Sequence, residues 1–400
     1  MTLLAWILIC APVLLVAYAY AGYPLLLWLL AHLRRPAAPP APPAQWPSIS
    51  ICVPVYNEEA QIRGLIESLL ALDYPPEKRQ ILVVSDASTD GTDAIVEEYA
   101  PAGVELLRLP ERSGKTAAET AAAAHLRGEI IVNTDASIRI RPDALKPLIA
   151  RFADPAVGVA SGRDVSIARH ADDPNIGEAG YVGYEMAVRA LETRLGGIIG
   201  ASGCFYAIRP ELYRAAVPAH LSRDFASALI AREHGYRAVS VDEAVCFVPR
   251  TGSLQREYYR KVRTLSRGME TLLHKRHLLN PLRYGAFAWK LWSHKVCRWL
   301  APCGLALALP GLTLLAPTAP WADWALGAAA LGAALAWLGW RWPDRRPMPR
   351  ILAMPTSIAV VTLAALHSLY RALRGNRDAT WEPTRRDVIH PPVPAGGLRE

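Results

Sequence analysis

The feature that most constrains this chain is a long apolar run near its N-terminus. Residues 3–33 contain no Asp, Glu, Lys or Arg, and the run ends at two arginines. A helix of about 20 apolar residues spans the hydrocarbon core of a bilayer. The run is longer than that, no basic stretch precedes it, and it continues past Ala17 and Ala19, whose spacing resembles a signal-peptide cleavage site. We therefore predict a retained transmembrane anchor over residues 1–35.

Three further apolar segments near the C-terminus are long enough to be membrane helices: residues 300–316, 324–340 and 351–370. The loop at residues 341–350 holds four Arg and one Asp. The positive-inside rule places this loop, together with the long segment between the anchor and residue 300, in the cytoplasm. Four crossings put the basic tail at residues 373–400 outside, against the same rule. Either one segment is re-entrant or interfacial, or the rule fails for the tail.

Composition and charge narrow the class of protein further. Hydrophobic residues make up 52% of the chain and charged residues 20%, which excludes a disordered protein. The six Cys show no Cys-x-x-Cys spacing, so a zinc ribbon or a disulfide scaffold is not expected. Eleven Lys or Arg but only two Glu lie between residues 256 and 298. Because aromatic residues and membrane segments adjoin this band, we assign residues 253–299 to basic interfacial helices that contact membrane lipids, not nucleic acid.

Strand and helix patterns alternate between the anchor and the basic band. Buried, β-rich runs occur at four places, each followed by a helical pattern: residues 48–55, 81–85, 104–107 and 129–133. Such alternation predicts an α/β fold, a doubly wound and mainly parallel sheet, with its ligand at the carboxyl ends of the strands. We place this domain at residues 48–252, with Asn57 as the N-cap of its first helix. The Pro-rich residues 36–47 predict a stiff spacer before it.

Polar side chains gather where the predicted strands end. Asp86 and Asp135 each follow a strand, and Lys115 lies in the turn before an Ala-rich helix. Carboxylates can hold Mg²⁺ or Mn²⁺, which bridges phosphate oxygens, and an ammonium neutralises the remaining charge. These residues therefore suit a nucleotide diphosphate. Two alternatives stay open from the residues alone: Asp86 and Asp90 could cap the next helix, and Lys115 could be a solvated turn lysine.

Six short motifs occur in an order and spacing that resemble those of a known family: Val53-Pro-Val-Tyr-Asn-Glu58, Ser85-Asp-Ala-Ser-Thr-Asp-Gly-Thr92, Arg112-Ser-Gly-Lys115, Thr134-Asp-Ala-Ser137, Gly203-Cys-Phe-Tyr-Ala-Ile-Arg209 and Ser222-Arg-Asp-Phe225. Together they resemble the inverting glycosyltransferases of family 2. The likeness is to the membrane-anchored branch that includes cellulose, hyaluronan and poly-N-acetylglucosamine synthases. It covers about residues 47–268 and implies a GT-A-like fold.

The resemblance assigns five residues to a UDP-sugar donor. It places Tyr56 and Glu58 at the uracil end and Asp86 at uracil or ribose. It places Lys115 at the nucleotide and its phosphates. Arg263 lies where the family has the Arg of its Gln-x-x-Arg-Trp motif, so the resemblance places it at the diphosphate.

The resemblance also assigns the reacting groups. Asp135 stands at the first Asp of the family's Asp-x-Asp metal motif, and Asp224 stands at its catalytic base. Four positions depart from the family pattern. Ser137 replaces the second metal Asp, and Arg223 replaces the first acid of the pair that ends in Asp224. Arg260 and Thr264 replace the Gln and the Trp of the Gln-x-x-Arg-Trp motif. The loss of this Trp, which would hold an acceptor sugar, argues against processive polymer synthesis.

We therefore expect a metal-dependent, inverting hexosyltransferase of the cell's inner (cytoplasmic) membrane, with its catalytic domain in the cytoplasm and residues 300–372 as C-terminal membrane helices. It would move a sugar from a UDP-sugar to a lipid-linked or glycan acceptor in cell-envelope or exopolysaccharide synthesis. Three alternatives remain from the sequence. They are a processive polysaccharide synthase, a polyprenyl-phosphate sugar transferase and a non-enzymatic membrane scaffold. The sequence does not identify the sugar, because pocket shape selects the donor.

Overall fold

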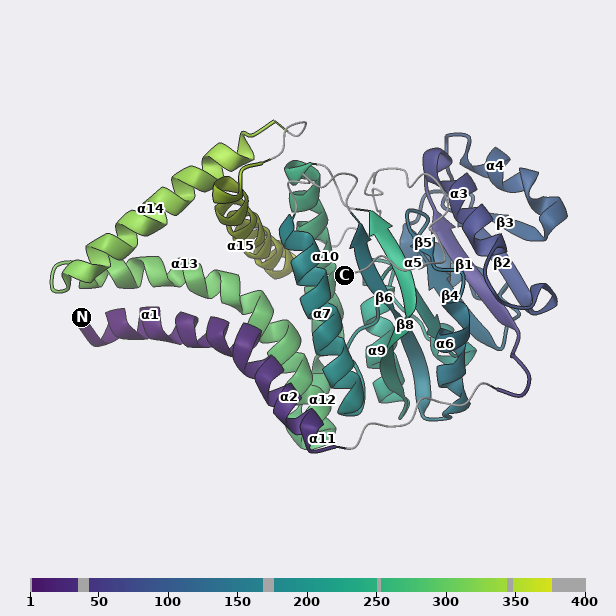
Figure 1. Cartoon of the computed structure of the whole chain (residues 1–400), viewed down its shortest axis with the longest axis horizontal. Helices are drawn as coiled ribbons and strands as arrows, with labels where there is room; N and C mark the ends of the chain where they lie inside the picture. Colours follow the sequence, from purple (N-terminus) through teal and green to yellow (C-terminus); the bar gives the residue numbers. More distant parts are fainter. Residues whose placement is uncertain (1, 35–42, 168–175, 250–252, 344–347, 376–400) are drawn as a thin grey trace. The chain divides into compact units, whose positions relative to one another are not determined.

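The computed structural model describes residues 2–34, 43–167, 176–249, 253–343 and 348–375. It divides into two compact units (Figure 1). Of the described residues, the first unit, called here the helical unit, comprises 2–33, 176–177, 253–343 and 348–375. The second, called here the α/β unit, comprises 34, 43–167 and 178–249. Most of the predicted Pro-rich spacer, and the predicted basic tail after residue 375, lie outside the described residues.

The α/β unit is built on one eight-stranded sheet with the order β3-β2-β1-β4-β7-β6-β8-β5. Its strands are β1 (Ile49–Val55), β2 (Arg79–Ser85), β3 (Val104–Arg108), β4 (Ile130–Thr134), β5 (Arg139–Ile140), β6 (Val157–Ile167), β7 (Phe205–Ile208) and β8 (Arg237–Pro249). The strands β3, β2, β1 and β4 are parallel, and so are β6 and β8. The strand β7 runs antiparallel to both of its neighbours, and β5 runs antiparallel to β8. The predicted α/β fold is confirmed as a mixed sheet.

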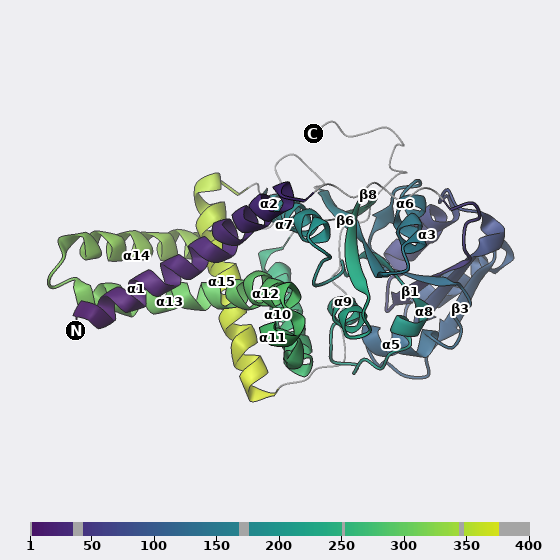
Figure 2. The same ribbon diagram turned by 90° about the horizontal axis from the view of Figure 1, so that it is seen from below.

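Helices cover both faces of this sheet, as Figures 1 and 2 show. One apolar core joins the sheet to α3 (Glu59–Leu70), α4 (Thr92–Glu98) and α6 (Leu145–Ala150). A second core joins the other face to α5 (Lys115–Ala122), α8 (Pro210–Tyr213) and α9 (Arg223–Glu233). The helix α7 (Ile176–Arg194) connects β6 to β7. Because α5 and α9 share one face, residues at their first turns can meet at the same edge of the sheet.

The direction of β7 follows from where the chain re-enters the sheet. The amide of Asp135, just past the end of β4, donates to the carbonyl of Cys204, just before β7 begins. The chain therefore enters at the carboxyl end of β4 and must run back along it. This edge, where parallel strands end and β7 starts, carries the polar residues described below.

The predicted cap at Asn57 is wrong. The helix α3 has Glu58 as its N-cap, and Asn57 has a positive φ of 52°. Asn adopts this left-handed conformation more readily than most residues. Its side-chain carbonyl instead accepts a hydrogen bond from the backbone amide of Thr89 at 2.8 Å, so it joins two loops at the edge of the sheet.

The helical unit contains four helices that are long and apolar enough to cross a membrane, one N-terminal and three C-terminal. They are Thr2–His32, Ala286–Leu315, Pro320–Trp340 (α14) and Arg350–Arg374 (α15). The first consists of α1 (Thr2–Ala17), a π-turn (Tyr18–Gly22) and α2 (Tyr23–His32). The second consists of α12 (Ala286–Leu291), a π-turn (Trp292–Cys297) and α13 (Arg298–Leu315). The unit also holds α10 (Leu254–His274), a 3₁₀ turn (Arg276–Leu279) and α11 (Pro281–Tyr284). Within the unit α1 packs on α13, and α15 packs on α10 and α14.

One of these helices begins earlier than the sequence predicts. The apolar run starts near residue 300, but the helix is continuous from Ala286, through a π-turn. Lys290 and Arg298 are buried on it, at 3% and 6% exposure. Their charges interrupt the hydropathy signal without interrupting the backbone hydrogen bonds, which is why the sequence pattern starts late.

The close approach of β1 to the loop before β4 gives a test of this fold. A Cβ added to Gly128 would lie 2.4 Å from the Ser50 amide nitrogen and 2.5 Å from the Ile49 carbonyl carbon. Backbone atoms cannot yield as a side chain can, so Gly128→Ala should destabilise the α/β unit by at least about 1–3 kcal/mol. Thermal unfolding of the detergent-solubilised protein measures the loss.

Gly180→Ala is the matched control, because a Cβ there meets nothing within 4 Å and Gly180 lies in α7. Alanine is the better helix former, so this change should raise the melting temperature slightly. Equal melting temperatures for Gly128→Ala and the wild type would contradict the register of β1 against β4.

Candidate active site

Asp86 fixes the turn that leads into α5. It lies just after β2 and is 2% exposed. Its Oδ1 accepts a hydrogen bond from the Ser113 amide at 2.7 Å, and its Oδ2 accepts one from the Gly114 amide at 2.8 Å. Asp90 is the residue that accepts from the first turn of the next helix, at the Thr92 amide. Asp86 is thus not a helix cap. Each of its carboxylate oxygens already accepts a hydrogen bond from a backbone amide, so the predicted contact with uracil or ribose must use the remaining acceptor capacity of the same oxygens.

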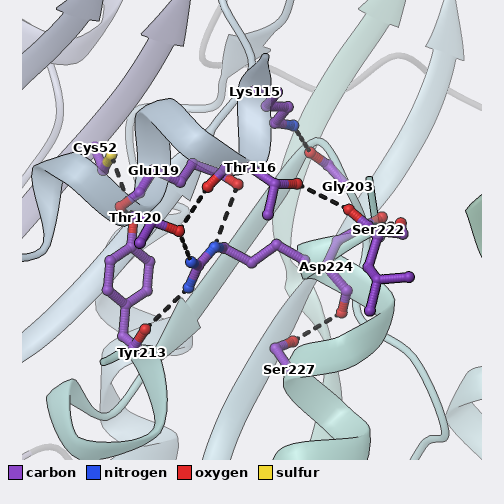
Figure 3. A network of polar contacts seen from close by, with 12 residues as sticks. Cys52, Lys115, Thr116, Glu119, Thr120, Gly203, Tyr213, Ser222, Asp224 and Ser227 are labelled. Atoms are coloured by element: carbon purple, nitrogen blue, oxygen red, sulfur yellow. Dashed lines mark hydrogen bonds and ion pairs between the residues drawn. The ribbon is translucent and has the colours of Figure 1, made fainter. Parts of the chain in front are cut away.

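Lys115 joins three separate segments of the α/β unit (Figure 3). It is the first residue of α5, and its Nζ lies 2.5 Å from Oδ1 of Asp135 and 3.2 Å from the carbonyl oxygen of Gly203. About a fifth of each charged side chain in this ion pair is exposed. The alternative of a solvated turn lysine is therefore wrong, because the ammonium points into the sheet edge and is engaged there.

The ammonium of Lys115 keeps its proton firmly. Burial by itself lowers the pKa of a lysine, but Asp135, Glu119 and Asp224 together raise the pKa of Lys115 above its ordinary value of 10.5. The same field acts on Glu119, where burial raises the carboxyl pKa, and Lys115 and Arg223 oppose the rise without cancelling it. The site therefore presents a permanent cation at neutral pH.

Asp224 lies in the first turn of α9, on the other side of Gly203. The Ser222 hydroxyl donates to its Oδ1. A Cβ on Gly203 would lie 2.7 Å from its Oδ2, so only glycine lets the backbone approach the carboxylate this closely. Gly203 thus touches Lys115 through its carbonyl and borders Asp224 through its Cα. We call Lys115, Asp135 and Asp224 the charged cluster.

Three further predicted donor residues lie apart from these contacts. The Arg112 guanidinium covers one face of the Tyr56 ring, 3.8 Å from its centroid, so a base must use the other face or displace Arg112. Glu58 is 8% exposed at the start of α3, and its amide donates to the Thr92 hydroxyl. Arg263 lies on α10, in the helical unit. The roles of Tyr56, Glu58 and Arg263 stay predictions.

The charged cluster offers a cation few protein ligands. Among the described residues no group of three or more His, Cys, Asp or Glu could hold a metal. Asp135 supplies a hard carboxylate oxygen, and Ser137, which is 8% exposed, stands where the family has a second Asp. Mg²⁺ typically binds through one or two carboxylates while keeping waters and substrate phosphates as its other ligands. The donor set at Asp135 fits that mode of binding, with most ligands coming from the substrate.

The sequence did not reveal the polar side of α5. Thr116, Glu119 and Thr120 fall on one helical face at spacings of three and four residues, within a run of alanines. Such a stripe is typical of a solvent-facing surface, yet Thr116 is 3% exposed and Glu119 is 1% exposed. The side chains contact the segment that precedes Asp224. The spacing of these three polar residues was the only sequence feature that could have pointed to them, because a polar helix face has the same sequence pattern whether protein or solvent covers it.

Comparison with known proteins places the α/β unit in a family. Residues 50–213 match the model of Glycosyl transferase family 2. An N-acetylglucosaminyltransferase from Sinorhizobium fredii is 28% identical over 325 residues, which cover 75% of this chain and 76% of that protein. A beta-monoglucosyldiacylglycerol synthase from Synechocystis sp. is 32% identical over 122 residues, covering 30% of this chain and 26% of that protein. For three of the curated relatives the chain spans only 26% to 57% of their length.

A solved structure shares the fold across nearly the whole chain. Mannosyltransferase PcManGT from Pyrobaculum calidifontis, in complex with GDP-Man and Mn²⁺, superposes with a TM-score of 0.70 at 23% identity. The match covers 92% of this chain and 99% of that one. The predicted GT-A-like fold is thus confirmed. Residues 50–213 match the family model and the six motifs keep its order, so this chain contains a Glycosyl transferase family 2 domain.

Proposed function

We propose that this glycosyltransferase is membrane-bound, inverting and metal-dependent, and that it moves a sugar from a UDP-sugar to a lipid-linked or polysaccharide acceptor. The observation that carries the proposal is the meeting of Lys115, Asp135 and Asp224 around Gly203. Sugar transfer from a nucleotide donor needs positive charge where the diphosphate departs and a base where the acceptor hydroxyl attacks. The charged cluster supplies both within one small region.

The charged cluster supports a single displacement at the anomeric carbon. Asp224 accepts the proton of the acceptor hydroxyl as the new carbon–oxygen bond forms, and the bond to the diphosphate breaks on the opposite face. A carboxylate within hydrogen-bond reach of the acceptor hydroxyl is one of the side chains that act as such a base. The Lys115 ammonium stabilises the departing negative charge. Asp135 would hold a divalent cation, which would supply further neutralisation of the charge on the diphosphate.

The names of related proteins support sugar transfer from a nucleotide sugar. One relative is named for N-acetylglucosamine transfer and another for the synthesis of a glucosylated diacylglycerol, while the solved mannosyltransferase holds GDP-Man and Mn²⁺. We place the uracil end of the donor at Tyr56 and Glu58, with Asp86 beside it. The diphosphate would lie at Lys115, and a contact with Arg263 stays a prediction from the sequence. The lipid-linked acceptor fits a chain with four apolar helices.

We further propose that the protein resides in the cytoplasmic membrane with its catalytic domain in the cytoplasm. The charge pattern supports this orientation, because four Arg lie in the loop at residues 341–350. Nucleotide sugars would then reach the charged cluster from the cytoplasm. The domain assignment follows: an anchor at residues 1–35, a catalytic domain at residues 48–252, basic interfacial helices at residues 253–299 and membrane helices at residues 300–372.

The direct test is a donor screen with the purified full-length protein in detergent or nanodiscs. We expect release of nucleotide diphosphate from at least one UDP-sugar when a membrane lipid extract and Mg²⁺ or Mn²⁺ are present, and loss of that release when EDTA is added. Mass spectrometry of the lipid fraction then identifies the acceptor. Release that occurs only with GDP-sugars would reject the UDP assignment, and no release with any donor would reject the enzyme.

The base is tested by Asp224→Asn, which keeps the size of the side chain but removes its charge. We expect the transfer rate to fall on the order of 10²–10⁴-fold, while the dissociation constant for UDP, measured by calorimetry, changes little. Glu233→Gln at the far end of α9 is the matched control and should transfer at the wild-type rate. Near-normal turnover by Asp224→Asn would remove it from the mechanism.

The charge state of Lys115 gives a pH prediction. Its folded pKa is raised above the ordinary 10.5, so the folded protein holds this proton more tightly than the unfolded chain does. The resulting stabilisation is complete below pH 10.5 and is lost as the pH rises through the folded pKa. The stability difference between wild type and Lys115→Met should therefore be constant from pH 7 to 9.5 and shrink above about pH 10.5.

Urea unfolding across this pH range measures the difference, and Lys146→Met is its control. Lys146 pairs with Asp73 at the surface, where an ion pair contributes little. If the Lys115→Met difference already shrinks between pH 7 and 9, the amine is not the permanent cation described here.

A further inference from the structure

Arg223 occupies a position where the family resemblance leads one to expect an acid, directly before the proposed base. An exposed arginine there would bring positive charge next to Asp224. The structure instead buries Arg223 to 4% exposure, with its guanidinium against Thr120 and Glu119 of α5, residues that Figure 3 shows on that helix. The sequence departure is therefore not a change in the chemistry at the acceptor hydroxyl.

Three partners hold the Arg223 guanidinium. It donates to the Tyr213 carbonyl at 2.9 Å and to the Thr120 hydroxyl. Its Nε lies 3.6 Å from Oε2 of Glu119, a carboxylate that is 1% exposed. These two facing atoms are both buried and neither has a hydrogen bond among the described residues. The two charges thus face each other, as buried charges require, and Lys115 also acts on Glu119.

The contacts of Arg223 are part of a larger set of hydrogen bonds between α5 and the segment before Asp224. The Thr116 hydroxyl donates to the Leu221 carbonyl at 2.9 Å. The Tyr213 hydroxyl donates to the Glu119 carbonyl at 2.9 Å. Residues 213–223 are therefore tied to one face of α5 at their start and at their end. The same helix begins with Lys115, so the position of α5 affects both the proposed leaving-group cation and the segment that leads to the proposed base.

We propose that Arg223 is a positioning residue, and that its buried pair with Glu119 fixes the place of the Asp224 carboxylate relative to the Lys115 ammonium. This inference rests on the proposed function, because it presumes that Asp224 and Lys115 act on one substrate. Arg223 is the first residue of α9 and Asp224 is the second. Holding the guanidinium against α5 thus fixes the backbone that carries the base, less than one helical turn away. Where the family has an acid beside Asp224, this chain has Arg223, and the nearby carboxylate is that of Glu119 on α5.

A pair that only stabilises the fold makes a different prediction from a pair that also positions the base. Removing one partner leaves a buried, uncompensated charge, so Arg223→Met or Glu119→Leu alone should unfold more easily whichever role is true. Replacing both with apolar residues of similar volume is often neutral or stabilising. The double variant Arg223→Met/Glu119→Leu therefore separates positioning from stability.

We expect the double variant to melt close to or above the wild-type temperature. Its kcat should fall roughly 10- to 100-fold, since a misplacement of about 1 Å can cost on the order of 10²-fold in rate. The KM for the donor sugar should change less than about threefold, because Lys115 keeps its own contacts. Arg223→Lys keeps the positive charge but lacks the planar guanidinium that donates several hydrogen bonds at once. Its kcat should therefore lie between those of the double variant and the wild type.

Arg209→Met is the matched control. Arg209 also donates to backbone carbonyls, those of Phe152, Val157 and Asp154, but none of these leads to Asp224. We expect Arg209→Met to lower the melting temperature and leave kcat unchanged. A double variant that folds and turns over at the wild-type rate would overturn the positioning role.

Hydrogen exchange keeps the test independent of the assay. In the double variant, the amides at the first turn of α9 should exchange at least about 10-fold faster than in wild type, and in Arg209→Met they should not. Unchanged exchange would also overturn the inference. If the wild-type protein transfers no sugar at all, the proposed function fails, and the exchange rates still decide whether Arg223 anchors the start of α9.

Discussion

The ammonium of Lys115 is the contact on which the rest of the site depends. It joins the first turn of α5 to the residue after β4 and to the loop before β7, three segments that are far apart in sequence. They meet only because parallel strands end at this edge while β7 enters from the same edge in the opposite direction. The mixed sheet is therefore what brings a cation, a carboxylate and a glycine carbonyl together.

A second layer of buried polar residues holds the reacting groups in place. Asp86 binds the two amides just before Lys115, and Arg223 binds α5 just before Asp224. In both cases the residue that reaches the charged cluster follows an anchored one. Buried polar contacts of this kind are costly when left incomplete, so they favour one arrangement over many. The site is thus held through the backbone beside the reacting side chains.

Much of this organisation could be predicted from the sequence. The alternation of strands and helices predicted the α/β fold, and uncharged runs predicted four membrane-spanning helices, because both patterns are local. The start of the second apolar helix at Ala286 could not be predicted, since Lys290 and Arg298 mask it. The antiparallel course of β7 was also hidden, because strand direction depends on where the chain re-enters the sheet and not on residue pattern.

The candidate site shows the same limit at the level of side chains. Strand ends predicted that Asp135 and Lys115 would lie together, and the ion pair at 2.5 Å confirms it. Yet the bonds of Asp86 to a turn and the inward course of Arg223 depend on tertiary contacts. A polar stripe in an alanine-rich helix has the same sequence whether water or another helix covers it, so Glu119 gave no sign of its partner.

The charge balance around Lys115 explains why the proposed site calls for a cation. Two positive groups, Lys115 and Arg223, stand against three acids, Glu119, Asp135 and Asp224, and the pKa of Lys115 responds to all three of those acids. With every acid ionised the group carries one net negative charge, and with Glu119 protonated it is neutral. Neither state attracts a diphosphate. A cation held at Asp135 would reverse this sign, and by taking up the Asp135 carboxylate it would leave the Lys115 ammonium for the leaving group.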